Sequence, residues 1–200
     1  MKKILLTGFE RFQGESINPS EQIVRQLSGT LKDSVEGLIL PVSYERAFEF
    51  LKSHLEKQSY QVILMLGQAS GRRHIGFERV AINLMDSETA DEDQVLKKEQ
   101  KILHDGSDAY VSELPLRQWV DVLRKENLPV EISNTAGTFV CNALYYQVLS
   151  FLSEKKSRSQ ALFVHVPYLP EQVEGKSVET PSLSLEIMLQ TIQRLIQEMA

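Results

Sequence analysis

Residues 62–66 read VILML, and residues 67–71 read GQASG. A short, continuous apolar run that ends in a turn-rich stretch is typical of a strand covered on both faces of a sheet. Residues 161–166, ALFVHV, have the same character. Strands of this kind occur mainly in parallel sheets that carry helices on both faces. The two stretches therefore predict an α/β fold with a mostly parallel, twisted sheet.

The sequence around these two strands alternates strand-length apolar runs with helical patterns, which is typical of the same fold class. Further strands are predicted at residues 4–9, 38–42, 75–84 and 130–133, and helices at 47–55, 116–123 and 141–152. Asn18-Pro19 predicts another helix start, because Asn caps a helix and Pro fits its first position. The last helix is predicted to start near Thr180-Pro181. Residues 86–105 are polar and aperiodic, which indicates a surface excursion. Without a repeat or linker, residues 1–200 are expected to form one domain.

The composition excludes several classes of protein. The formal net charge is −5, whereas nucleic-acid-binding domains usually carry a basic stripe, so we expect no nucleic-acid partner. No apolar stretch is long enough to span a bilayer, and we expect no membrane association. The opening residues MKKILLTGFERF lack the long apolar core of a signal peptide. The single cysteine fits a reducing compartment. These features predict a soluble cytoplasmic protein.

Cys141 is the first candidate for chemistry. It follows the small-residue turn at 133–137, SNTAG, and lies at or near the start of a predicted helix. Unpaired N–H groups and the helix dipole at such a position favour a thiolate, so we expect a lowered thiol pKa there. The same N–H groups could stabilise an oxyanion. The alternative is a buried, inert cysteine.

His165 and Glu78 are the candidate partners of Cys141. His165 ends a buried strand just before Pro167, so its side chain could reach a cleft at the edge of the sheet. On the strand predicted at 75–84, Glu78 shares a face with apolar residues, where a carboxylate needs a partner such as an imidazole. The alternatives are a core histidine bonded to backbone and a salt bridge from Glu78 to Arg72, Arg73 or Arg79.

Other kinds of site find no support in the sequence. His54, His74 and His104 lack the spacing of metal ligands, and one cysteine cannot build a thiolate zinc site. The glycines of GQASGR match no dinucleotide or phosphate-loop fingerprint. We therefore expect neither a metal nor a cofactor.

Three segments resemble motifs of the type I pyroglutamyl peptidase family of cysteine peptidases. GQASGRRHIGFERVAIN is similar to the family's glutamate signature, ISNTAGTFVCN to its cysteine signature, and VHVPYLPEQ to its histidine segment. TGFERF followed by NPS is similar to the family's N-terminal motif. The segments occur in the family's order and span nearly the whole chain.

The resemblance implies a three-layer α/β/α sandwich and a cytoplasmic omega peptidase that removes an N-terminal pyroglutamyl residue from peptides, often as a homotetramer. Cys141 would be the nucleophile, His165 the base and Glu78 its partner. Positions that line or neighbour the family's pyrrolidone pocket correspond to Phe9, Phe12, Gln68, Phe139 and Val140. A five-membered lactam suits aromatic walls with a few placed polar groups. The alternative for the phenylalanines is ordinary core packing.

The chain departs from the family pattern at the rim of the expected pocket. Glu88, Thr89 and Ala90 stand where the family typically has arginine, an apolar residue and proline. Within the glutamate motif, Gly76 replaces the family's usual hydroxyl residue. A charge inversion at position 88 could weaken binding or change the substrate. Two alternatives therefore remain, a non-catalytic homologue that binds peptide N-termini or small lactams, and a hydrolase of another cyclic amide.

Overall fold

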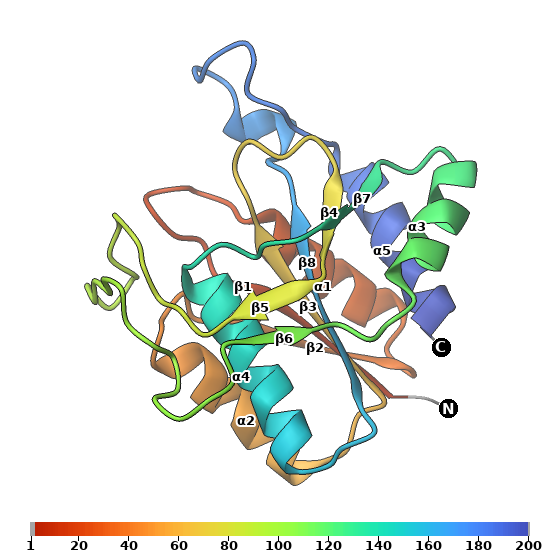
Figure 1. Cartoon of the computed structure of the whole chain (residues 1–200). Helices are drawn as coiled ribbons and strands as arrows, with labels where there is room; N and C mark the ends of the chain where they lie inside the picture. The colour runs from red at the N-terminus through yellow and green to blue at the C-terminus, as the bar shows by residue number, and fades with distance from the viewer. Residues whose placement is uncertain (1–2, 200) are drawn as a thin grey trace.

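The computed structural model describes residues 3–199. The strands are β1 (Ile4–Phe9), β2 (Val35–Leu40), β3 (Val62–Gln68), β4 (Ile75–Glu78), β5 (Val80–Ile82), β6 (Ala109–Val111), β7 (Val130–Ser133) and β8 (Gln160–Val166). The helices are α1 (Pro19–Thr30), α2 (Arg46–Lys57), α3 (Leu116–Lys125), α4 (Val140–Glu154) and α5 (Leu185–Met199), with a short 3-10 helix η1 (Pro170–Gln172). Figure 1 shows these elements in chain order.

The central sheet has the strand order β2-β1-β3-β8-β4-β7. Strands β2, β1, β3 and β8 are parallel, β4 runs antiparallel to β8, and β7 is parallel to β4. Strands β5 and β6 form a separate two-stranded sheet. The mostly parallel α/β fold predicted from the buried apolar runs is confirmed.

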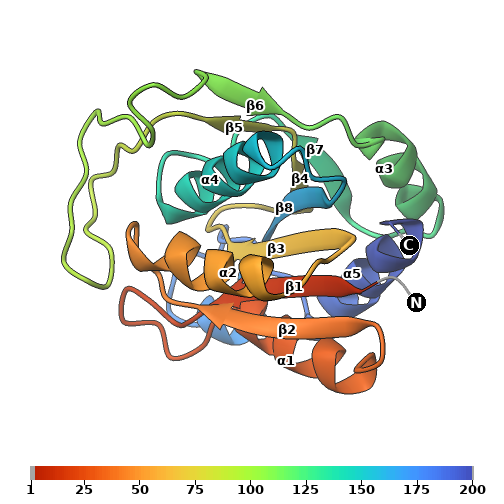
Figure 2. The same cartoon turned by 90° about the horizontal axis from the view of Figure 1, so that it is seen from below.

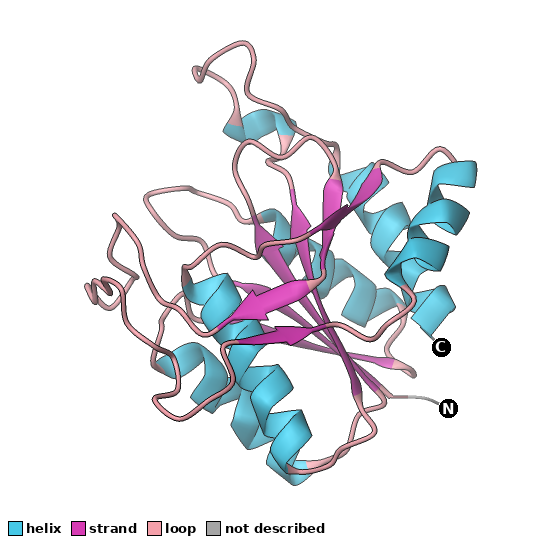
Figure 3. Ribbon diagram, in the orientation of Figure 1, coloured by secondary structure: helices cyan, strands magenta, loops and turns pink. Residues whose placement is uncertain are grey.

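Helices cover both faces of the central sheet, which makes a three-layer sandwich (Figures 2 and 3). One face packs against α1, α3 and α5 through residues such as Leu64, Val164 and Ile192. The other face packs against α2 and α4 through residues such as Met65 and Phe163. Because side chains alternate along a strand, each strand contributes to both cores. Within residues 3–199, no helix is both long and apolar enough to cross a bilayer.

The start of α1 is confirmed in detail. The Asn18 side chain accepts a hydrogen bond from the Ser20 N–H at 3.0 Å, and Pro19 is the first helical residue. Both residues therefore act as the sequence predicts, the first by satisfying an N–H group without a helical partner and the second through its fixed φ.

Three predicted boundaries are wrong. The second strand spans Val35–Leu40 instead of 38–42, because it pairs with β1 from Ile4 onward and Pro41 has no N–H to continue the ladder. The predicted strand at 75–84 is two strands in two sheets. Arg79 separates them, since its N–H bonds to β7 through the Ser133 carbonyl while its own carbonyl accepts from Ser112, next to β6.

The last helix begins at Leu185 and not near Thr180-Pro181. Ser182 forms an isolated bridge with Tyr168, and the Leu183 N–H donates to the Tyr168 carbonyl at 2.9 Å. This pairing keeps the chain extended up to Ser184, whose hydroxyl accepts from the Ile187 N–H. The helix can start only after that cap.

The segment 86–105 is irregular, as predicted, but it is held by hydrogen bonds. Asp91 is buried, and its carboxylate accepts from the N–H groups of Tyr44, Asp93 and Val95. The Asn83 side chain accepts from the N–H groups of residues 102 and 103 at the other end of the segment. In Figure 1 the segment loops out beside α4, coloured yellow-green. Its fold therefore depends on two buried polar side chains and not on periodicity.

Gly8 gives a test of how closely β1 packs against α1. A Cβ added at Gly8 would lie 2.6 Å from the Ser20 carbonyl oxygen, whereas one added at Gly29 in α1 would meet nothing within 4 Å. We expect Gly8→Ala to lower the free energy of unfolding by about 1–3 kcal/mol, because backbone must move. Gly29→Ala is the matched control and should be neutral or stabilising by up to about 1 kcal/mol. Urea unfolding of both variants measures the difference, and equal stabilities would contradict the packing described.

Candidate active site

Glu78 and His165 are brought together on one face of the central sheet. In the antiparallel register, Gly76 pairs with His165 and Phe77 with Val164, so Glu78 follows level with Phe163. Residues 76 and 78 of β4 and residues 163 and 165 of β8 then share the face that α4 covers. Because β4 runs opposite to β8, its last residue lies within the sheet and not at the outer edge. Glu78 is accordingly 0% exposed.

The two side chains are directly hydrogen-bonded. His165 Nδ1 lies 2.7 Å from Glu78 Oε1, and His165 is only 4% exposed. A carboxylate only accepts, so Nδ1 carries the proton in this contact and Nε2 keeps its lone pair when the ring is neutral. The arrangement fixes the tautomer of the imidazole and leaves Nε2 free to act as a base.

Arg72 shares the same carboxylate oxygen. Its Nη2 donates to Glu78 Oε1 at 2.8 Å and to the Thr135 carbonyl at 3.1 Å. The sequence offered a salt bridge and an imidazole contact as alternatives for Glu78, and the structure contains both. The second carboxylate oxygen, Oε2, has no hydrogen-bond partner within residues 3–199.

Cys141 lies over the same face of the sheet. It is the second residue of α4, and a Cβ added at Gly67 would lie 2.9 Å from its Sγ and 2.8 Å from the Phe163 ring. Gly67 in turn pairs with His165 in the parallel register of β3 and β8. The missing side chain at position 67 therefore makes room for the sulfur beside the strand that carries the histidine.

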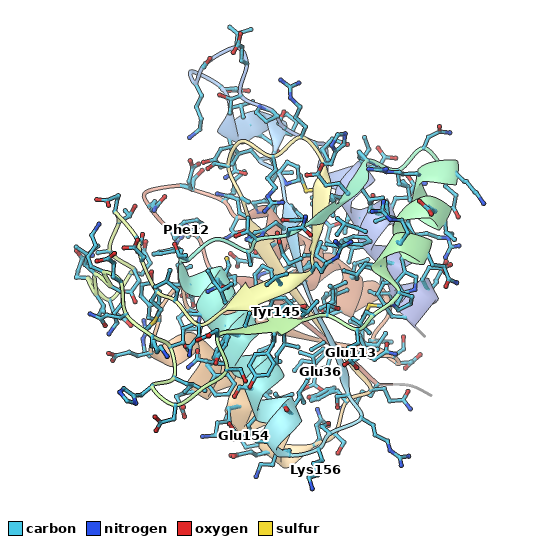
Figure 4. All side chains as sticks on the ribbon, viewed as in Figure 1. Phe12, Glu36, Glu113, Tyr145, Glu154 and Lys156 are labelled. Carbon is cyan, nitrogen blue, oxygen red and sulfur yellow. The ribbon has the colours of Figure 1, made fainter. Side chains whose placement is uncertain are left out.

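Two side chains of α4 hold Cys141 in this position. The Asn142 side chain accepts from the Ile82 N–H at 3.0 Å and donates to the carbonyls of Ile82 and Leu84. The Tyr145 hydroxyl donates to the Glu78 carbonyl at 3.2 Å. Figure 4 labels Tyr145 near the centre of the molecule. These bonds join the first turns of α4 to the end of β4 and to β5, so the thiol and the carboxylate are held by the same contacts.

The expectation of a lowered thiol pKa is wrong. Burial raises the pKa of the Cys141 thiol to about 12, and the negative charge of Glu78 also raises it. The N–H of Cys141 and the charge of Arg72 act in the opposite direction and are outweighed. The desolvation of the sulfur thus raises the thiol pKa by more than the helix start and Arg72 lower it. The thiol is neutral near pH 7 and needs a base to become a nucleophile.

Unpaired N–H groups are present at the start of α4. Phe139 provides no side-chain cap, and the first backbone bond of the helix runs from the Ala143 N–H to the Phe139 carbonyl. No backbone acceptor in the part of the chain that the structure describes bonds to the N–H groups of Val140, Cys141 and Asn142. Such donors beside a nucleophile can stabilise the negative oxygen of a tetrahedral intermediate.

Four of the five predicted pocket residues belong to the apolar cluster that also contains Cys141. Phe9 and Val140 are buried in it, and Phe12 and Phe139 pack against it. The Phe139 ring meets Tyr44 edge-on, with centroids 5.4 Å apart. Phe139 and Val140 lie at the start of α4, next to Cys141, and Figure 4 labels Phe12 in the upper half of the view and Glu154, the last residue of α4, in the lower half.

Gln68 is placed differently from the other predicted pocket residues. It is 9% exposed, and it follows Leu66 on the strand face that packs against α1 and α5. Its Oε1 accepts a hydrogen bond from Gln172 Nε2 at 2.8 Å. The side-chain carbonyl of Gln68 is therefore already paired with η1.

Of the predicted rim positions, Glu88 and Thr89 are exposed and Ala90 is partly buried. The Glu88 side chain is 94% exposed and pairs with Lys98 Nζ at 2.5 Å. The Thr89 carbonyl accepts from the Ser87 hydroxyl. The Thr138 carbonyl accepts from the Asp86 N–H at 3.1 Å, which ties this segment to the turn before Cys141.

Sequence reasoning missed Gly67 and Asn142 and treated Arg72 only as a competing partner of Glu78. A glycine inside an apolar strand run was the one available signal at position 67, because such a residue often marks a close approach. Nothing local distinguishes Asn142 or Arg72 from other polar residues. Among residues 3–199, no group of three or more His, Cys, Asp or Glu side chains is arranged to hold a metal ion.

Comparison with known proteins identifies the family of this chain. The family model described as pyroglutamyl peptidase matches residues 2–200. A pyrrolidone-carboxylate peptidase of Fusobacterium nucleatum is 39% identical over 198 residues, covering 98% of this chain and 92% of the relative. One from Bacillus licheniformis is 39% identical over 194 residues, covering 96% of this chain and 89% of the relative.

Solved structures are similar over the same length. The pyrrolidone carboxyl peptidase of Fervidobacterium islandicum has a TM-score of 0.94 and 38% identity, covering 99% of this chain and 98% of the other. The pyroglutamyl peptidase I of Bacillus amyloliquefaciens has a TM-score of 0.91 and 36% identity, covering 97% of this chain and 94% of the other. The chain therefore belongs to the pyroglutamyl peptidase family.

Proposed function

We propose that the protein is a cysteine omega peptidase that hydrolyses the amide bond after an N-terminal pyroglutamyl residue of peptides. The observation that carries this proposal is the hydrogen bond between His165 Nδ1 and Glu78 Oε1 on the sheet face over which the Cys141 thiol lies. Membership of the family supports the substrate class. Cys141 is the proposed nucleophile, His165 the base and Glu78 its partner.

The reaction starts from a neutral thiol. His165 Nε2 takes the proton of Cys141 as the sulfur attacks the pyroglutamyl carbonyl carbon, because burial holds the pKa of the thiol at about 12 and keeps it protonated in the free protein. A carbon–sulfur bond forms, and the carbonyl oxygen becomes an oxyanion. N–H groups at the start of α4 stabilise that oxyanion. Glu78 stabilises the imidazolium throughout.

The intermediate then breaks down in two steps. The carbon–nitrogen bond breaks, and His165 gives its proton to the departing amine of the next residue. The remaining thioester is attacked by water, whose proton passes to His165 Nε2. Breakage of the carbon–sulfur bond releases pyroglutamate and returns the proton to the sulfur. These reaction steps use only the three side chains, the N–H donors at the start of α4 and water.

The apolar cluster beside the thiol suits the proposed substrate. Phe12 and Phe139 are partly buried and pack against the cluster that Cys141 also packs against, so they are the proposed walls for the lactam methylenes, together with the buried Phe9 and Val140. The resemblance also suggests Gln68 as a polar contact to the lactam, but its placement on the face of α1 and α5, with Oε1 bonded to Gln172 Nε2, gives that role no support.

Release of a fluorescent amine from a pyroglutamyl conjugate tests the proposal. We expect wild-type protein to release the amine and Cys141→Ala to lose at least about a thousandfold in kcat/KM, because no other group can form the covalent intermediate. Prolyl and glutaminyl conjugates, measured in parallel, should be poor substrates. Turnover by a folded Cys141→Ala variant would remove the nucleophile assignment. Faster release from a glutaminyl conjugate would remove the substrate assignment.

The raised pKa of Cys141 predicts how the resting protein reacts with iodoacetamide. Because the pKa lies near 12, the thiolate fraction should keep increasing from about pH 7 to about pH 10, by roughly tenfold per pH unit. Cys141 is the single cysteine of the chain, so the label reports it alone. The urea-unfolded protein is the control and should level off above the ordinary thiol pKa. A plateau near neutral pH in the folded protein would indicate a resting thiolate–imidazolium pair instead.

We also propose that the protein works in the cytoplasm as a homo-oligomer, a tetramer by resemblance to the family. The single cysteine and the net charge of −5 support a soluble protein of a reducing compartment. Exposed apolar side chains such as Val111 on β6 and Val178 are available for contacts between copies. Light scattering of the purified protein should give about four times the chain mass of 22.8 kDa. A monomeric mass at micromolar concentration would contradict the oligomer.

A further inference from the structure

The Arg72 guanidinium connects two parts of the site that come from different segments of the chain. One nitrogen, Nη2, bonds both to Glu78 Oε1 at 2.8 Å and to the Thr135 carbonyl at 3.1 Å. Thr135 lies in the turn that leads from β7 to Cys141. The same oxygen of Glu78 is bonded to His165. Arg72 is therefore one contact away from the histidine and holds the turn before the nucleophile.

Gly76 makes room for this guanidinium. A Cβ added at Gly76 would lie 2.6 Å from Arg72 Nη1, while its next contacts, Arg72 Cζ and the Ser133 Cβ, would be at an ordinary 3.5 and 3.6 Å. Gly76 lies directly beside His165 in the register of β4 and β8. A glycine within a buried strand normally weakens it, and the close approach of Arg72 is the physical reason for this one.

The charge of Arg72 has two consequences at the site. Glu78 is 0% exposed, and its Oε2 has no hydrogen-bond partner within residues 3–199, so the cation offsets the cost of burying the carboxylate. The charged or titratable groups that face Cys141 are Glu78 from β4, His165 from β8, Tyr44 from the connection before α2, and Arg72. Of these, Arg72 is the permanent cation, and it favours the thiolate.

We propose that Arg72 is a positioning residue of the reaction, which holds the Glu78 carboxylate aligned on His165 and whose guanidinium occupies the space that Gly76 leaves. The proposal rests on the catalytic roles given under Proposed function. Arg72 acts through Glu78 and the turn before Cys141, and it needs no contact with the substrate.

Arg72→Gln should lower kcat/KM for the pyroglutamyl conjugate by about 10- to 100-fold, mainly through kcat, because a charge-assisted hydrogen bond to a buried carboxylate is lost. It should also slow alkylation of Cys141 at pH 9 by about 3- to 10-fold, because the thiolate loses a favourable charge. Arg73→Gln is the matched control, since it removes the same charge from the next, exposed position and should change neither value.

Gly76→Ala displaces the guanidinium without altering Arg72 itself. Only the flexible tip of Arg72 must move, so the variant should fold and reproduce both effects, and the double variant with Arg72→Gln should add little. Thermal unfolding of every variant separates these effects from loss of the fold. Wild-type kcat and alkylation rates in either single variant would overturn the proposal. A wild-type protein that releases no amine would contradict the proposed function, and the alkylation rates would still decide the role of Arg72.

Discussion

A buried carboxylate sets the conditions for the rest of this site. Glu78 has no exposed surface, and an ionised group there is stable only when cations or donors surround it. The structure supplies His165 and Arg72, both on the same oxygen. The hydrogen bond from His165 to Glu78 therefore fixes the orientation of the imidazole. The position of the imidazole in turn defines where a nucleophile can be deprotonated.

The antiparallel strand β4 is what makes that burial possible. A parallel β4 would place its last residue at the open edge of the sheet, whereas the observed direction places Glu78 level with Phe163 inside it. Tyr145 of α4 then donates a hydrogen bond from its hydroxyl to the backbone carbonyl of Glu78. Core packing and site geometry thus share residues, so a change in the α4 interface alters the position of the thiol as well as the stability of the fold.

The acidic segment 86–105 differs from the family pattern without disturbing the site residues. Two of its acidic residues differ sharply, since Asp91 is buried and accepts three N–H groups, while Glu88 is almost fully exposed and paired with Lys98. Asp91 therefore determines the path of the chain. Glu88 lies on the surface, where salt screens its charge. The departure at position 88 is therefore compatible with an intact arrangement of Cys141, His165 and Glu78.

The sequence by itself determined the fold class and pointed to Cys141, His165 and Glu78 as candidate residues. Continuous apolar runs such as residues 62–66 predict buried parallel strands, and the cysteine, histidine and glutamate segments carry the resemblance to the family. Only the tertiary structure decided where the strand at 75–84 divides, that α5 begins at Leu185, and that the Cys141 thiol has a raised pKa. It also decided the close contacts of Gly67, Gly76 and Arg72 with the site. The physical reason is that all of these depend on distances between segments far apart in the chain, whereas periodicity and capping report only on neighbours.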